Sequence, residues 1–412
     1  MIGAALVSCD KSANVPDPAP VPATHGTLKI GVRGLKDASS RAGTKVGSVA
    51  GEGLSVTMGG SSSLFTRAGA LANDDIINDI WMLQFVPQYD NDNDVATLAI
   101  VKAQYQNSIP APKTYASGET YYNIEYDYLP QESVVFFIAN TGDASLFSEG
   151  MVLNMTEFYQ KLLFSFDSES SVVSSNGIVM ASEDSYAVYD DGSVDADEIW
   201  LERIAVKLEF TLDLSELTLP PGDQLNIATV QVKNVPKMGM ALNVTYPSAE
   251  GYSVFPPVGE IVPSEGIPDF SDLYTYTSAS ELFMSYDPAA YVPVDDAQTF
   301  VWYIPSNLRG TNTDIPSQQY KYWANDPSYL GTQNTDDEGS YSTCIEIAGT
   351  YTYSSSGETE PVTITIYPGS SYNPVQDYQS FNLYRNTWYN LNATIRYIES
   401  GIDPRVDLPS PI

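Results

Sequence analysis

The chain has very little of the chemistry on which most enzymes depend. Its 412 residues include one histidine, His25, and two cysteines, Cys9 and Cys344. A catalytic triad with histidine as the base therefore has no candidate in the body of the chain. The same scarcity removes ordinary zinc sites and any expectation of a structural disulfide. We predict that the protein is not an enzyme and holds no cofactor and no metal.

Basic residues are also scarce. The chain has 19 Lys and Arg residues against 52 Asp and Glu residues, which gives a formal net charge of -33. Such a surface repels phosphate backbones, so we expect no nucleic-acid partner. The charge is expected to keep an exposed protein soluble and monomeric until it assembles.

Long apolar runs are absent as well. No stretch reaches the ~18 to 20 consecutive apolar residues that a membrane-spanning helix needs. A short apolar run ends instead in Leu6-Val7-Ser8-Cys9, which has the spacing of a lipobox, and a Pro-rich tract follows at residues 14–22. We therefore expect Cys9 to carry a diacylglycerol anchor and residues 1–25 to be a lipoprotein signal and tether. The alternative is an unmodified cysteine, because no Lys or Arg precedes Cys9.

The body of the chain has the composition of a folded β protein. Hydrophobic residues make up 43% of it and aromatic residues 12%. Alternating apolar runs bounded by Pro, Gly, Asn and Asp predict strands. These runs are 27–33, 54–58, 80–86, 95–101, 121–126, 133–139, 225–235, 299–304, 343–348, 362–367 and 388–397.

Two further segments bear on the organisation of the chain. Apolar residues near helical spacing predict a short helix over Met155 to Phe164. The run 199–214, which alternates across Leu208, Phe210, Leu212 and Leu214, predicts one long strand near the middle of the chain. Because new turn signals and a second strand series follow, we place a domain boundary close to residue 202. The prediction is an all-β chain of two tandem β-sandwich domains.

Three candidate sites remain open from the residues alone. Asp90-Asn-Asp-Asn-Asp94 has alternating oxygen ligands but lacks the Gly and Glu of a calcium loop, so a solvated turn is favoured over calcium. Paired carboxylates for glycoside hydrolysis have no separation that the sequence defines. A polar loop at 314–339 places four aromatic residues together as candidate contacts for a glycan or surface ligand, namely Tyr320, Tyr322, Trp323 and Tyr329.

Several segments together resemble the Bacteroidales type V fimbrillin family, including its accessory subunits. The segments that carry the resemblance are Arg67–Phe85, Ile199–Phe210, Phe300–Gly310, Cys344–Gly349 and Phe381–Asn386. The resemblance implies an outer-membrane lipoprotein with two transthyretin-like Greek-key domains, at 68–201 and 202–400. It further implies a propeptide at 26–67 with an N-terminal strand, and cleavage between Arg67 and Ala68 by an Arg-specific or trypsin-like protease.

The same resemblance implies an assembly mechanism and a set of partners. Loss of the N-terminal strand leaves an apolar groove and edge amides, which are ready for strand addition by another fimbrial subunit. The tail at 401–412 carries two prolines among its last four residues and is a poor donor strand. We therefore expect a tip or accessory subunit of a fimbria, with an anchor subunit next and a stalk subunit third. The competing hypothesis is a monomeric glycan-binding surface lipoprotein.

Overall fold

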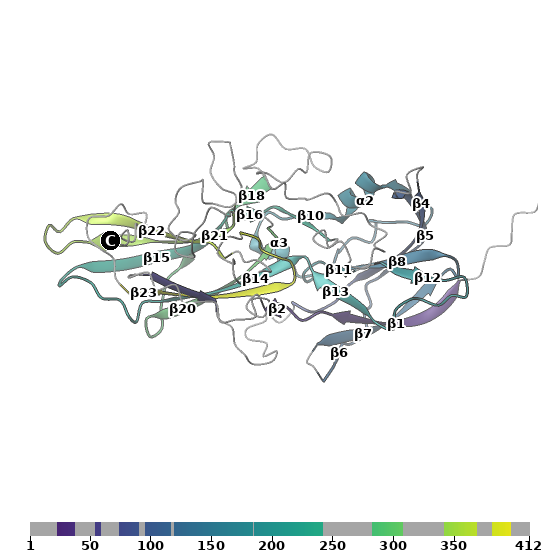
Figure 1. Ribbon diagram of the computed structural model, residues 1–412, viewed down its shortest axis with the longest axis horizontal. Helices are drawn as coiled ribbons and strands as arrows, with labels where there is room; N and C mark the ends of the chain where they lie inside the picture. Colours follow the sequence, from purple (N-terminus) through teal and green to yellow (C-terminus); the bar gives the residue numbers. More distant parts are fainter. Residues whose placement is uncertain are drawn as a thin grey trace, which may run out of the picture.

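The computed structural model describes residues 23–37, 54–58, 74–89, 95–116, 119–183, 185–241, 282–307, 342–368 and 381–396. These ranges form an elongated molecule of two β-sandwiches placed end to end (Figure 1). The all-β class predicted from the sequence is confirmed. No helix within the described ranges is long and apolar enough to cross a membrane.

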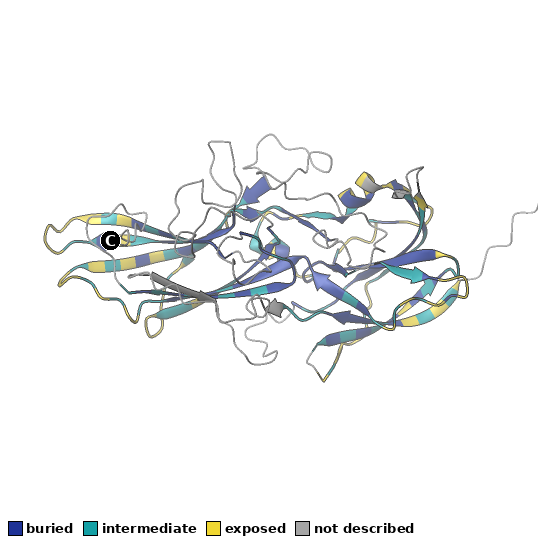
Figure 2. Ribbon diagram, in the orientation of Figure 1, coloured by how far each residue is buried: buried dark blue, intermediate teal, exposed yellow. Residues whose placement is uncertain are grey.

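The strands of the first sandwich form one sheet in the order β6-β7-β1-β13-β11-β8-β4-β5-β9, with β12 also paired to β8. Their bounds are β1 Thr24–Val32, β4 Ile80–Tyr89, β5 Val95–Gln106, β6 Lys113–Thr114, β7 Thr120–Tyr128, β8 Ser133–Ala139, β9 Val152–Asn154, β11 Met180–Ser182, β12 Tyr186–Val188 and β13 Ile199–Arg203. The sheet folds on itself, so that β1, β7 and β13 face β4 and β8 across a shared apolar core. Buried residues alternate with more exposed ones along β7, in the part of the molecule that Figure 2 draws in alternating colours.

Strand β8 explains why part of the first sandwich is apolar throughout. All its residues are buried. Val135 and Phe137 face the core shared with β1, whereas Phe136 and Ile138 face a second apolar cluster that includes helix α2 (Met155–Leu162). A strand covered on both faces loses the alternation of a half-exposed strand and becomes a continuous apolar run.

Helix α2 forms where the sequence predicts a helix. Asn154 caps it, because its side chain accepts a hydrogen bond from the Glu157 amide at 2.9 Å while the Glu157 carboxylate accepts one from the Asn154 amide at 2.9 Å. The helix buries Phe158, whose ring lies 5.4 Å from that of Phe85 in an edge-to-face arrangement. A second helix in the described ranges, α3 (Glu169–Val172), has one turn. The helix predicted to reach Phe164 ends at Leu162, because β10 (Leu163–Ser165) pairs with β17 (Met238–Met240).

The second sandwich packs two sheets face to face. One has the order β2-β23-β14-β20 with β3 also on β23, and the other has the order β19-β15-β21-β22. The bounds are β2 Lys36–Asp37, β3 Leu54–Met58, β14 Ala205–Asp213, β15 Gln224–Lys233, β19 Ala289–Ala290, β20 Ala297–Pro305, β21 Cys344–Thr352, β22 Thr359–Ile366 and β23 Thr387–Ile395. A separate short pair joins β16 (Val235–Pro236) to β18 (Phe283–Met284).

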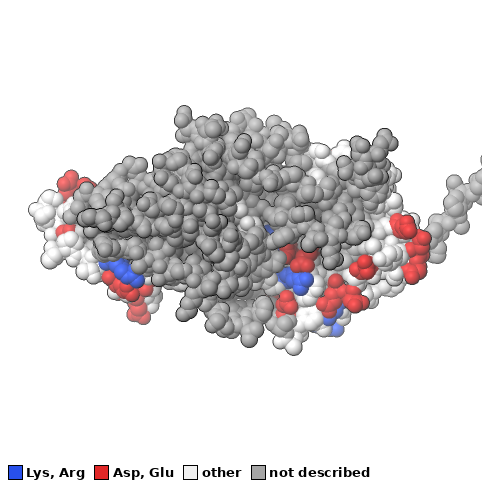
Figure 3. Space-filling model, viewed as in Figure 1, with Lys and Arg blue, Asp and Glu red and all other residues white. Residues whose placement is uncertain are grey.

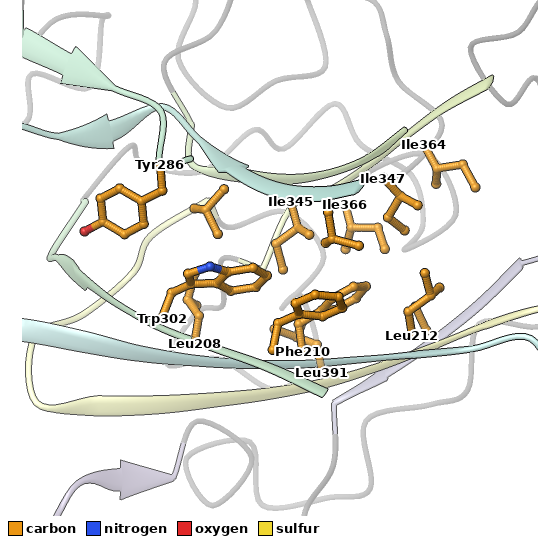
Figure 4. Close-up of a cluster of buried hydrophobic side chains, with 14 of the residues drawn as sticks. Leu208, Phe210, Leu212, Tyr286, Trp302, Ile345, Ile347, Ile364, Ile366 and Leu391 are labelled. Carbon is orange, nitrogen blue, oxygen red and sulfur yellow. The ribbon is translucent and has the colours of Figure 1, made fainter. Parts of the chain in front are cut away.

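The core of the second sandwich is aromatic and branched aliphatic. In Figure 4, Ile345, Ile347, Ile364 and Ile366 of one sheet pack against Leu208, Phe210, Leu212, Trp302 and Leu391 of the other. The rings of Phe300 and Trp302 stack with their centroids 5.5 Å apart. Interdigitated side chains of this kind fix the register of both sheets, because a slip of one residue would turn every core side chain to solvent.

The prediction of one long strand over residues 199–214 is wrong. The chain leaves the first sheet after β13 and enters the second at β14. Between them, the Ile204 amide donates to the Val179 carbonyl next to β11 at 3.0 Å, and the Ile204 carbonyl accepts from the Ser306 amide next to β20 at 3.4 Å. This residue therefore makes one bond toward each of the two sheets. No Pro, Gly, Asn or Asp lies between Ile199 and Leu212, and therefore the sequence does not mark the change of sheet.

Candidate functional site

The strands β1, β2 and β3, which we call the N-terminal segment, lie against both sandwiches. β1 is inserted between two strands of the first sandwich, antiparallel to β7 from Thr24 to Val32 and parallel to β13 from Ile30 to Val32. β2 and β3 then lie along one edge of β23, in the second sandwich. In Figure 1 the segment therefore runs from one end of the molecule toward the other.

The inward face of β1 completes the core of the first sandwich. Leu28, Ile30 and Val32 are 6%, 0% and 2% exposed, and they belong to the same cluster as Tyr122 of β7 and Ile199 of β13. Each buried aliphatic side chain of this size stabilises the fold by about 1.5–3 kcal/mol. Without β1, the space between β7 and β13 would become an apolar groove with two strand edges, which we call the β1 groove.

The outward face of β1 is cationic and meets carboxylates. His25 Nδ1 lies 2.9 Å from an Asp127 oxygen, and the Lys29 ammonium donates to the Glu198 carboxylate. The hydrogen bond to Asp127 raises the pKa of His25. The hydrogen bond between Lys29 and Glu198 raises the pKa of Lys29 and lowers that of Glu198, which keeps both groups ionised near neutral pH.

Arg33 continues this face just after β1. Its Nε and one terminal nitrogen donate to the two carboxylate oxygens of Glu183 at 2.8 and 3.1 Å, in a bidentate pair. Its guanidinium carbon also lies 4.3 Å from the centre of the Trp200 ring. The planar guanidinium can make both contacts at once, which a lysine ammonium cannot do in the same way.

A buried polar cluster holds the segment where it passes between the sandwiches. Arg203, which is 3% exposed, donates to the Arg33 carbonyl at 2.7 Å and to the Asn386 side-chain oxygen at 2.8 Å. Asn386 in turn donates to the Gly34 carbonyl at 3.2 Å. The same Arg203 side chain donates to the Asp74 carbonyl. One guanidinium therefore contacts both the N-terminal segment and the residue at which the described chain resumes after it.

Asp74 is itself fixed at this junction. It is 3% exposed, and its carboxylate accepts a hydrogen bond from the Tyr303 hydroxyl at 2.8 Å. The next residue, Asp75, accepts from the Thr120 hydroxyl at 2.9 Å. The chain on the far side of residues 59–73 is thus anchored by contacts that do not involve β1, β2 or β3. A cut anywhere in 59–73 would separate the N-terminal segment from the rest of the protein covalently while leaving Asp74 in place.

The residues singled out by sequence lie outside the described ranges. These are Cys9, Arg67, Ala68, Tyr320, Tyr322, Trp323 and Tyr329, together with the Asp90–Asp94 run, and their roles stay predictions. Within the described ranges, no group of three or more His, Cys, Asp or Glu residues could hold a metal ion.

Sequence reasoning missed the residues of the outward face of β1, the ring that this face contacts, and the junction. Lys29, Arg33, Trp200 and Arg203 stand in segments that it assigned to strands or to a domain boundary. One signal was available: between Leu28 and Val32 the apolar positions alternate with Lys29 and Gly31. An alternating strand must place these two sets of residues on opposite faces.

Comparisons with known proteins give one family match, to a domain of unknown function (DUF4906), over residues 302–393. No curated protein matches the chain in sequence. Among solved structures, the chain is similar to the tip fimbrial protein Mfa3 from Porphyromonas gingivalis, at 13% identity and a TM-score of 0.38, over 89% of this chain and 94% of that one. It is also similar to a fimbrial assembly protein from Parabacteroides distasonis, at 9% identity and a TM-score of 0.35, over 90% of this chain and 92% of that one. Both of these solved structures are of fimbrial proteins from the bacterial group whose fimbrillins the sequence resembles.

Proposed function

We propose that this chain is a structural or adhesive subunit of a cell-surface fimbria that accepts a donor strand from another subunit once its own β1 has left. In this proposal the chain is exported as a lipoprotein anchored through Cys9 to the outer membrane. Cleavage between Arg67 and Ala68 then frees the N-terminal segment. The mature subunit lies at the tip of the fimbria or has an accessory role in it. Its two sandwiches correspond to domains at 68–201 and 202–400.

The observation that supports this proposal is the position of the N-terminal segment against the two sandwiches. β1 lies between two strands of the first sandwich, and its inward side chains are among the most buried in the chain. The connection between this segment and the rest of the protein is the stretch 59–73, which contains Arg67. Loss of β1 would expose apolar surface and the edge amides of β7 and β13, and a strand from a second chain restores both kinds of contact.

The test is a brief digestion of the full chain with trypsin, followed by mass measurement and a binding assay with purified partner subunits from the same cells. A cut after Arg67 together with a gain of detergent-resistant complexes supports the proposal. The control variants are Arg67→Ala, which should block both events, and Arg41→Ala, which removes another trypsin site of the N-terminal region and should block neither. Assembly by the Arg67→Ala chain at the wild-type level would refute cleavage at this site.

The alternative function is a monomeric glycan-binding surface lipoprotein that keeps β1 permanently. Its candidate contacts are the four aromatic residues of the loop predicted from the sequence at 314–339, namely Tyr320, Tyr322, Trp323 and Tyr329. Aromatic side chains offer flat apolar faces on which sugar rings can stack. Glycan binding that is lost on Trp323→Ala, in a chain indifferent to Arg67→Ala, would favour this alternative. No catalytic turnover is expected in either case.

A further inference from the structure

The β1 groove is specialised on its outer side as well as its inner side. Along β1 and the residue after it, every second side chain points outward, and three of these are His25, Lys29 and Arg33. Each meets a carboxylate from a neighbouring element, in the order Asp127, Glu198 and Glu183. The carboxylates stay on the protein when β1 leaves, so an emptied groove would be rimmed by negative charge.

Aromatic rings lie between these carboxylates. The Lys29 ammonium is 4.0 Å from the centre of the Tyr115 ring and 4.6 Å from that of Tyr121, and Arg33 lies over Trp200. The rings of Tyr115 and Tyr121 are themselves in contact, with centroids 4.4 Å apart. A ring face attracts a cation through its quadrupole, so rings and carboxylates together select positive side chains at two positions four residues apart.

A third requirement lies midway between these positions. Gly31 is paired with Trp200, and a Cβ atom at Gly31 would come within 2.6 Å of two carbons of the Trp200 ring. Arg33 and Tyr115 also contact the Trp200 ring and hold it in place. A larger residue in this register would have to displace the ring and disturb the contact with Arg33, so the site favours glycine.

These requirements are hard to meet in a chain with so few cations. The chain has 19 Lys and Arg residues against 52 Asp and Glu residues, and the run Leu28-Lys-Ile-Gly-Val-Arg33 is its single occurrence of apolar, basic, apolar, Gly, apolar, basic. On the face drawn in Figure 3, the Lys and Arg atoms that are visible lie against Asp and Glu atoms. A replacement for β1 therefore has to come from outside the rest of this chain.

We propose that the β1 groove selects, from another subunit, an extended donor strand of the pattern apolar, basic, apolar, Gly, apolar, basic. The apolar residues take the places of Leu28, Ile30 and Val32, and the basic residues those of Lys29 and Arg33. This inference rests on the proposed function, because it supplies the chemistry of the partner that the emptied groove accepts. Charge complementarity then gives specificity and speeds encounter, while the apolar positions hold the strand in place.

The test uses the full chain cut within residues 59–73 and synthetic 14-residue peptides with the sequence of residues 24–37. The peptides are the native sequence, a charge-reversed form (Lys29→Glu with Arg33→Glu), a Gly31→Val form and an Ile30→Asp form. Capture of each labelled peptide is measured on the cut chain and on a cut chain carrying Glu183→Lys with Glu198→Lys. We expect charge reversal and Gly31→Val each to weaken capture about tenfold or more, and the reversed peptide to regain its capture on the reversed chain.

The outcomes separate this inference from the proposed function. If the native peptide is captured no better than the Ile30→Asp peptide, the groove does not accept strands and the proposed function fails. If the native peptide is captured but the charge-reversed and Gly31→Val peptides are captured equally well, the proposed function stands and the selection rule is overturned. Rescue of the reversed peptide by the reversed chain supports the rule, since a merely misfolded variant would not bind better. An uncut copy of this chain could also donate its own β1 to the cut chain. If such mixed dimers form faster than the peptide binds, the assignment of the donor strand to a different subunit is overturned.

Discussion

The proposed assembly depends on how firmly β1 is held in the first sandwich. A substitution of Ile30 tests this most directly. Its side chain is 0% exposed and packs in the core of the first sandwich, while Thr27 on the same strand is exposed. Ile30→Ala removes buried methyl and methylene groups and leaves a cavity, which costs about 2–5 kcal/mol. Thr27→Ala is the matched control, because an exposed substitution should change stability by no more than about 0.5 kcal/mol.

The assay measures release of the segment after a defined cut. A specific protease site placed at residues 59–63 allows the chain to be cut without relying on Arg67. The fraction of N-terminal fragment lost from the cut protein is then followed by native mass spectrometry. Since about 1.4 kcal/mol corresponds to a factor of ten, Ile30→Ala should raise the equilibrium constant for release between about 30-fold and several thousand-fold.

Two results would contradict this reasoning. Equal release from the Ile30→Ala and Thr27→Ala chains would mean that the inward face of β1 does not hold the segment. Immediate and complete release of the segment from the cut chain without either substitution would mean that the contacts of Arg203 and of β2 and β3 with β23 add nothing measurable. Urea unfolding of the uncut chains, followed by fluorescence, supplies the independent stability difference.

Three further predictions follow from single residues. The hydrogen bond to Asp127 raises the pKa of His25 above 6.5, so the stabilisation from this pair is fully present below about pH 6.5 and is lost as pH rises through the raised pKa. The cut segment should therefore leave slightly faster at about pH 9 than at about pH 6. His25→Ala should remove this difference. Burial raises the pKa of Cys344 to about 12, so iodoacetamide at about pH 8 should label this thiol only after the chain unfolds. Peptide mass mapping detects the label, and labelling of the native chain would contradict the buried position of Cys344. A Cβ atom at Gly349 would lie 2.4 Å from a backbone oxygen of β15 beside a bulge, so Gly349→Ala should lower the free energy of unfolding by about 1–3 kcal/mol, whereas the exposed Thr350→Ala should change it by less than about 0.5 kcal/mol.

Local patterns in the sequence determined most of the longer strands and helix α2, but not the short strands. The strands predicted at 54–58 and 133–139 have the same first and last residues in the structure, and the short helix begins at Met155 as predicted. This success has a simple reason. Alternation and helical spacing report which faces of an element are apolar, and both patterns can be read within a single element.

Only the tertiary structure decided which strands meet. β1 pairs with β7, which follows about a hundred residues later, and in parallel with β13, while β2 and β3 pair with the last strand, β23. Nothing local distinguishes these partners from other apolar strands, because pairing depends on burial summed over the whole core. The sheet change at Ile204 was invisible for the same reason. The cationic face of β1 could be read from the sequence. The carboxylates and rings that contact this face come from several separate segments, and only folding brings them together.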